Sequence, residues 1–232
     1  PYPHAVGGCT TVPPQRVVDV IIGALSKVVP EQCCACNGQW SGGIYGGIDP
    51  KTNRNFVYNE SFGCGLGAKY NDDGANGHHS HMSNTANAPT EMIEMEHPIR
   101  VLQYSLVQDS GGAGEYRGGL GLLSEVELLT ETNVSIIADR DKIRPYGLFG
   151  GQGGLPNAHY GKFPDGSQHT IAAEKVPAGT ITVQRTSGGG GWGDPAKRDR
   201  KLIEWDVLNG YVSIEAAKRE YGVTIDPETM KI

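Results

Sequence analysis

The chain has 232 residues and a formal net charge of −6, and 34 of its residues are glycine. The acidic balance argues against a nucleic-acid partner and against an anionic membrane surface, and no apolar run approaches the ~20 residues of a membrane span. Glycine is about twice as frequent as the usual ~7 %, but glycine and proline together stay below the ~25–30 % of low-complexity chains. We therefore expect an ordered fold, rich in turns and close backbone contacts.

The first predicted element is a helix. Apolar residues recur at helical spacing between Gln15 and Val29, and Pro30 is expected to end the helix. A glycine-rich zone follows, in which glycine pairs and the run 63–67 surround short apolar pieces. The helix, this zone and a histidine-rich loop make up a first segment, residues 1–97.

From Ile99 onward the pattern predicts β-strands. Apolar and polar residues alternate over 101–106 and again over 122–128, and two shorter β-like runs cover 134–138 and 180–184. These strands define a second, β-rich segment, residues 98–198.

The last segment, residues 199–232, is predicted to be helical. Asp199 is expected to cap a helix that ends near Gly210, and Ser213 a second helix that ends before Gly222. The predicted class is therefore α+β, with a glycine-rich, β-rich centre, a helix near the N-terminus and two short C-terminal helices.

Cysteine usage indicates a reducing compartment. An odd number of cysteines without a secretory signal argues against a disulfide framework, so a cytoplasmic location is expected. Cys33 and Cys36 have the two-residue gap of a zinc-binding pair, but no second pair lies at a suitable distance. Buried, unreactive thiols are the favoured interpretation. The five cysteines are Cys9, Cys33, Cys34, Cys36 and Cys64.

The strongest candidate for chemistry is the loop 72–85, called the histidine loop below. It holds three of the seven histidines and two carboxylates among small polar residues. Neutral imidazole transfers protons and binds metals near pH 7. His79 and His81 would point the same way in an extended segment, and Asp72 or Asp73 would complete the site or orient an imidazole. An active-site or interface-lining role, metal ligation and a plain polar turn all remain open.

A second glycine-rich run, Gly188–Gly193, resembles a phosphate loop but lacks its Lys-Ser/Thr, and Asp194 would repel a phosphate. A tight chain crossing beside Trp192 is the favoured interpretation, and a substrate cavity lined by backbone N–H groups is the alternative. The pair Asp139-Arg140 follows a predicted strand, and either a solvated strand end or a position facing a site fits it.

Several motifs together resemble one family. They occur in the family's order over nearly the whole chain, and they resemble the C-terminal part of a longer subunit of the hydantoinase B/oxoprolinase family. The motifs are His79–Thr85, Asp109–Gly121, Tyr146–Gly151, Gly188–Arg198 and Asp206–Ala217. The resemblance implies that the three segments form one continuous part of that subunit.

The resemblance also implies an ATP-dependent enzyme. ATP and magnesium are expected on a separate hydantoinase A-like subunit, and a divalent metal is possible in the N-terminal part of the family's subunit, so no metal ligand is assigned here. Family members open cyclic amides such as hydantoins, 5-oxoproline and lactams, and relatives carboxylate ketones. Phosphorylation of the carbonyl oxygen links the two reactions, because it makes either an imidate that water attacks or an enol that attacks carbon dioxide.

Within this frame we assign candidate roles from residue chemistry. His79 and His81 are expected to act as general acid or base, Asn84 to bond the polarised oxygen, and Asp73 to complete the catalytic group. Gly189 and Gly190 are candidates for substrate binding through their N–H groups. A cyclic-amide hydrolase is preferred, and a ketone carboxylase subunit and a scaffold without catalytic groups remain the alternatives.

Overall fold

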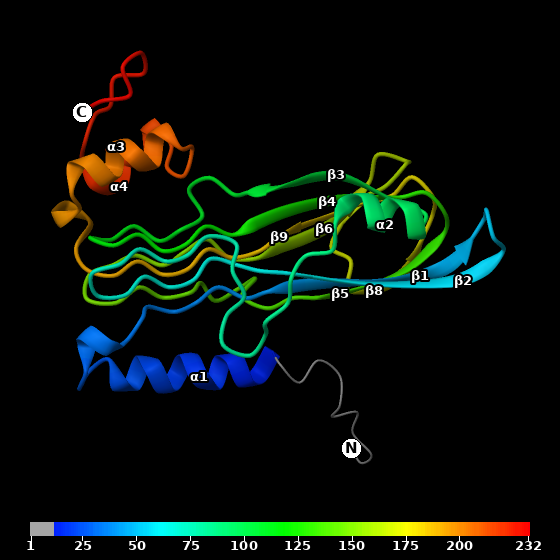
Figure 1. Cartoon of the computed structure of the whole chain (residues 1–232), viewed down its shortest axis with the longest axis horizontal. Coiled ribbons are helices and arrows are strands. Elements are labelled where there is room, and N and C mark those ends of the chain that lie inside the picture. Colours follow the sequence, from blue (N-terminus) through cyan, green and yellow to red (C-terminus); the bar gives the residue numbers. More distant parts are fainter. Residues whose placement is uncertain (1–11) are drawn as a thin grey trace.

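The structure, a computed structural model, describes residues 12–232 (Figure 1). In this part of the chain it contains four α-helices, two 3-10 helices and nine strands. In chain order they are α1 (Val12–Leu25), η1 (Pro30–Gln32), β1 (Ser41–Asp49), β2 (Arg54–Phe62), α2 (Thr90–Glu96), β3 (Ile99–Leu106), β4 (Leu122–Leu128), β5 (Thr132–Ile137), β6 (Ala158–Lys162), β7 (Gln168–His169), β8 (Ala173–Val176), β9 (Ile181–Arg185), η2 (Pro195–Lys197), α3 (Arg200–Leu208) and α4 (Ile214–Tyr221).

The strands form two antiparallel sheets that pack face to face. One sheet has the order β2-β1-β5-β8 and the other the order β3-β4-β9-β6-β7, and Figure 1 shows them as two layers. Buried side chains from both sheets, such as Tyr45 of β1 and Val126 and Leu128 of β4, make one core, and Ile93 of α2 joins it. The predicted α+β class is confirmed.

The predicted strands are present. In β4 the buried residues Leu122, Ser124, Val126 and Leu128 alternate with more exposed neighbours, as the sequence pattern indicates. β2 was not predicted. β1 was not predicted either, because glycine is disfavoured in strands and β1 contains four glycines. These glycines make room for bulky neighbours: a Cβ on Gly43 would lie 2.5 Å from the Tyr45 hydroxyl.

Helix α1 differs from its prediction in two ways. It ends at Leu25, before the predicted Val29, where the Ser26 hydroxyl donates to the Gly23 carbonyl at 2.8 Å. Its buried residues are the polar Gln15 and Asp19, whereas its apolar residues, among them Val17, Val20 and Ile21, are exposed. Helix α1 is therefore attached to the body through polar contacts. None of the helices in residues 12–232 is long and apolar enough to cross a membrane.

The C-terminal helices match the prediction closely. The Asp199 side chain caps α3 by accepting from the Lys201 N–H. The Ser213 hydroxyl caps α4 by accepting from the Ala216 N–H, and Gly222 ends this helix in the left-handed conformation. Apolar side chains of both helices form a second, smaller core.

A layer of glycine-rich segments extends both sheets toward these helices. Segments that are distant in sequence meet there backbone to backbone: the Gly189 N–H donates to Gly119 O at 2.9 Å, and the Gly190 N–H to Cys36 O at 2.8 Å. A Cβ on Gly189 would lie 1.9 Å from Leu66 O, and a Cβ on Gly190 2.0 Å from Tyr146 O. This geometry supports the interpretation of the Gly188–Gly193 run as a tight chain crossing.

We predict that Gly189→Ala lowers the free energy of unfolding by more than about 4 kcal/mol, the range of severe core disruption, because the methyl group collides with backbone that has no room to move. Gly46→Ala is the matched control, since a Cβ there meets nothing closer than 3.7 Å; its effect should stay within about 1 kcal/mol. Denaturant unfolding measures both. Equal losses for the two variants would contradict the prediction.

Candidate functional site

The histidine loop borders a pocket of about 480 Å³. The structure brings together three of the predicted site residues there, since Asp73, His79 and His81 all line this pocket, with Asn37 on the facing segment. The loop is fixed at several points by backbone bonds, such as the pair between Cys64 and His78. This pocket is therefore the first candidate site.

His81 is held by two partners on one ring nitrogen. Its Nε2 lies 3.2 Å from Asp19 Oδ1 on α1 and 2.9 Å from Asn37 Nδ2. A protonated Nε2 donates to the carboxylate, whereas an unprotonated Nε2 accepts from the amide. The imidazole therefore has a partner in either state. The side chain is 21 % exposed.

Asp19 is buried, with 3 % of its side chain exposed, among cationic groups. Arg16 and Arg140 each place a guanidinium nitrogen 3.0 Å from its Oδ2. Burial alone would raise the pKa of this carboxyl, but His81 and the two arginines lower the pKa below its ordinary value. Asp19 is therefore ionised at neutral pH, and its Oδ1 faces the His81 ring.

Sequence reasoning missed Asp19. The signal was a single carboxylate inside an otherwise apolar helical run, three residues after Arg16. Arg140, whose position was left open, is buried and faces this site, while Asp139 remains more exposed.

His79 has a different environment from His81. Its Nδ1 lies 2.9 Å from the Ser83 hydroxyl, and its buried Nε2 has no hydrogen-bond partner among residues 12–232. Burial, and next the neighbouring His78, lower the pKa of His79. The ring is therefore neutral at neutral pH and has a nitrogen free to bond.

Asp73 is engaged in holding the fold together. Its two oxygens accept from Arg198 Nη1 at 2.8 Å and Nη2 at 2.7 Å, and Oδ1 also accepts from the Arg117 N–H. Arg198 and Arg117 in turn bond Asp206 of α3. Burial opposes ionisation of Asp73, but Arg198 outweighs it and lowers the pKa. This geometry favours a structural role over proton transfer.

The other predicted site residues lie apart from the pocket. Asn84 is exposed and is not among the residues that line the pocket. The N–H groups of Gly188, Gly189, Gly190 and Gly191 are all donated to backbone carbonyls. This run therefore does not fit a nucleotide phosphate, and it offers a substrate no free N–H at Gly189 or Gly190.

The cysteines behave as buried thiols. Cys33, Cys36 and Cys64 are buried, and burial raises the pKa of Cys36 and of Cys64 to about 12. Cys34 is partly buried, and Cys9 lies outside the described residues. Within residues 12–232 no group of three or more His, Cys, Asp and Glu side chains is arranged to hold a metal ion.

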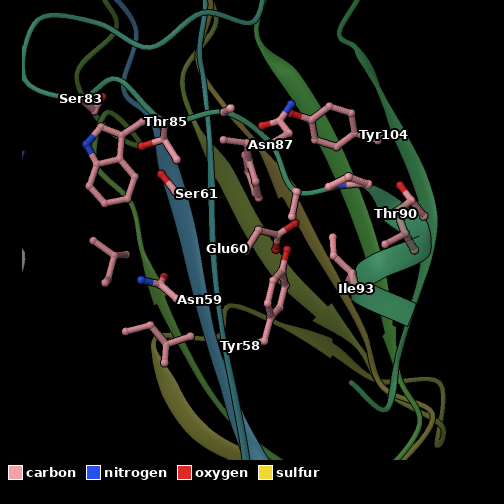
Figure 2. A pocket seen from close by; sticks show the side chains of 18 of the residues that line it. Tyr58, Asn59, Glu60, Ser61, Ser83, Thr85, Asn87, Thr90, Ile93 and Tyr104 are labelled. Carbon is pink, nitrogen blue, oxygen red and sulfur yellow. The ribbon is translucent and has the colours of Figure 1, made fainter. Parts of the chain in front are cut away.

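A larger cavity of about 780 Å³ lies beside the pocket, and Ser83 lines both. Glu60 of β2 lies in its wall (Figure 2). Sequence reasoning missed this residue because it missed the strand. The available signal was the alternation that places Glu60 on the same strand face as Phe56, Tyr58 and Phe62.

Comparison with known proteins identifies relatives. The sequence model of the hydantoinase B/oxoprolinase family matches residues 1–195. The chain is 42 % identical to the uncharacterized protein MJ0963 of Methanocaldococcus jannaschii, over 97 % of this chain and 39 % of that protein. It is 34 % identical to the caprolactamase subunit beta of Pseudomonas jessenii, over 97 % of this chain and 41 % of that protein. It is 35 % identical to 5-oxoprolinase 1 of Arabidopsis thaliana, over 82 % of this chain and 14 % of that protein.

Two solved structures share the fold. The ATP-dependent caprolactamase from Pseudomonas jessenii matches with a TM-score of 0.73 and 30 % identity, over 88 % of this chain and 38 % of that chain. A nucleotide-free acetone carboxylase matches with a TM-score of 0.71 and 20 % identity, over 87 % of this chain and 32 % of that chain. The chain thus spans about two-fifths or less of the proteins that it matches.

The Arg198 network generates a prediction about stability. Arg198→Met should lower the free energy of unfolding by about 3–5 kcal/mol, because it removes the guanidinium that bonds both the Asp73 and the buried Asp206 carboxylates and leaves Asp206 with Arg117 alone. Arg100→Met is the matched control: the Arg100–Glu127 pair is exposed, and its loss should cost less than about 1 kcal/mol. Urea unfolding of both variants tests this, and a tolerated Arg198→Met would refute it.

Proposed function

The chain belongs to the hydantoinase B/oxoprolinase family, and from this premise we propose that it is part of a subunit of an ATP-dependent hydrolase that opens cyclic amides. The substrates would be hydantoins, 5-oxoproline or lactams. Two relatives support this class through their names, a caprolactamase subunit beta and a 5-oxoprolinase. The observation that carries the proposal is the Asp19–His81 pair in the histidine-loop pocket.

The pair is suited to moving a proton. When Nε2–H of His81 donates to Asp19, Nδ1 keeps a lone pair that can accept a proton from water. The water oxygen then forms a bond to the carbonyl carbon, whose oxygen carries the phosphoryl group transferred from ATP. The carbon–nitrogen bond breaks, the imidazolium returns the proton to the departing ring nitrogen, and a second water hydrolyses the remaining acyl phosphate to a carboxylate and phosphate. Asp19 stabilises the cationic ring during this sequence, and Asn37 holds the ring edge when Nε2 is unprotonated.

The complex would contain more than this chain. A hydantoinase A-like subunit would bind ATP and magnesium, and the remaining part of the family's subunit, with a possible divalent metal, would complete the assembly. The partner supplies the nucleotide in this proposal, because the Gly188–Gly191 N–H groups are already bonded. The free thiols fit a cytoplasmic location.

The alternatives differ in their products. A ketone carboxylase would use the same histidine loop for enolisation, and its support is the fold shared with acetone carboxylase. A scaffold would leave catalysis to the partner. The Asp19–His81 pair favours a catalytic part over a scaffold, because a solvent-linked imidazole oriented by a buried carboxylate is arranged for proton transfer.

The substrate class is tested by ATP turnover of the intact complex with 5-oxoproline, hydantoins, lactams and ketones, each with and without bicarbonate. We expect phosphate release with a ring-opened product and no bicarbonate requirement. Strict dependence on bicarbonate with a carboxylated ketone would instead establish the carboxylase.

The role of His81 is tested by two variants. His81→Ala should lower kcat by about 10²–10⁴-fold, the usual contribution of general acid–base catalysis. Asp19→Asn should lower kcat too, because the ring loses the carboxylate that orients its Nε2 and stabilises the imidazolium during the reaction.

His169→Ala is the matched control for these variants, since His169 is exposed and pairs with Glu174 away from the pocket. Its kcat should match wild type, and thermal melts should show that all three variants assemble. Turnover of His81→Ala within severalfold of wild type would rule out the proposed role.

A further inference from the structure

The cavity beside the histidine loop has the size and lining of a small-molecule site. Its volume of about 780 Å³ lies in the range of ligand pockets. Apolar walls come from residues such as Trp40 and Ile44, and polar groups converge from β2, β3 and the segment before α2. Figure 2 shows that Glu60 lies between Asn87 and Tyr58, with Tyr104 beside Asn87. A few polar groups on an apolar surface are the usual means of orienting a ligand.

Glu60 is the ionisable group at the centre of this lining. The residue is only 9 % exposed. Its Oε2 accepts from the Tyr45 hydroxyl at 3.1 Å and its Oε1 from the Ser124 hydroxyl at 3.2 Å. Each oxygen retains bonding capacity toward the cavity. Among residues 12–232 no salt bridge reaches this carboxyl, in contrast to Asp19 and Asp73.

Without a cation, burial dominates the ionisation of Glu60 and raises its pKa to about 7. The other titratable groups around it are Tyr45 of β1, Tyr58 of β2 and Tyr104 of β3. Burial raises the pKa of all three above the ordinary tyrosine value, so they stay neutral from pH 6 to 9. β4 contributes the neutral Ser124, and His97, which follows α2, packs against the Tyr58 ring. Among these carboxyl and tyrosine hydroxyl groups, Glu60 is therefore the one that changes charge near neutral pH.

A cyclic amide is the chemical complement of such a carboxyl group. The ring forces the amide into the cis form, so the N–H donor and the C=O acceptor lie on one edge. A protonated carboxyl presents an O–H donor and a C=O acceptor at matching spacing. The two groups form a pair of hydrogen bonds, whereas a ketone offers only the acceptor.

We infer that the cavity bordered by Tyr58, Glu60, Ser83 and Asn87 binds the cyclic amide, and that Glu60 recognises its N–H and C=O edge. This inference rests on the proposed function and adds the place where the substrate is held. Ser83 links this place to the histidine loop, because its hydroxyl lies 2.9 Å from His79 Nδ1 and the residue lines both the cavity and the pocket.

The test measures binding directly, by isothermal titration calorimetry on the intact complex without nucleotide. The probes are ε-caprolactam, hydantoin and 5-oxoproline, together with N-methylcaprolactam, which keeps the carbonyl but lacks the N–H. For at least one probe, wild type should bind with an affinity that is constant below about pH 7 and falls up to tenfold per pH unit above it, as Glu60 loses its proton. N-methylcaprolactam should bind at least tenfold more weakly than caprolactam.

Two substitutions separate recognition from a merely structural role. Glu60→Gln presents N–H and C=O at every pH, so it should keep the affinity and lose the pH dependence. Glu60→Met presents neither, so it should bind at least tenfold more weakly at every pH. Glu127→Met is the control, because Glu127 pairs with Arg100 on the exposed side of β4; its binding should match wild type.

The outcomes also separate this inference from the proposed function. Binding of no probe by wild type, or unchanged affinity and pH dependence in both Glu60 variants, would overturn the inference even if cyclic amides are hydrolysed. Binding that follows Glu60 without any ring opening would instead count against the hydrolase and leave the cavity assignment standing. If Glu60→Met does not assemble, Glu60→Gln still tests the inference, because its affinity should no longer depend on pH.

Discussion

Backbone-to-backbone packing of glycine-rich segments is the constraint on which the rest of the structure depends. Gly189 touches Leu66 and Gly119 at distances that leave no room for a side chain. This packing fixes residues that orient the site: the Gly67 N–H donates to Asn37 Oδ1 at 3.0 Å, and the Asn37 amide nitrogen therefore faces His81. The glycine-rich packing thus helps to place the Asn37 side-chain amide beside His81.

Three buried or partly buried carboxylates illustrate how partners decide roles. Asp73 has both oxygens occupied by Arg198 and serves the fold. Asp19 also has arginine partners but shares one oxygen with His81, and so couples a fixed charge to a titratable ring. Glu60 has hydroxyl partners only, and burial raises its pKa to about 7. The same functional group thus provides an anchor, an orienting charge and a hydrogen-bond donor.

The sequence predicted those features that depend on local chemistry. The caps at Asp199 and Ser213, the alternation in β4 and the chain crossing at Gly188–Gly193 all follow from neighbouring residues. The sequence also indicated that His79 and His81 line one pocket, because both residues belong to one short loop. Asp19 and Glu60 were not found, because their roles depend on partners that are more than sixty residues away, namely His81 and Ser124.

Helix α1 turns its polar residues toward the body and its apolar residues outward. Apolar contacts tolerate sliding, whereas ion pairs and hydrogen bonds demand one distance and one direction. The Asp19 contacts to Arg140 and His81, together with the bond from the Tyr146 hydroxyl to the Asp19 carbonyl, therefore lock the helix in one rotation and one register. Because Asp19 is the α1 residue that bonds His81, the position of this helix sets the distance between the carboxylate and the imidazole.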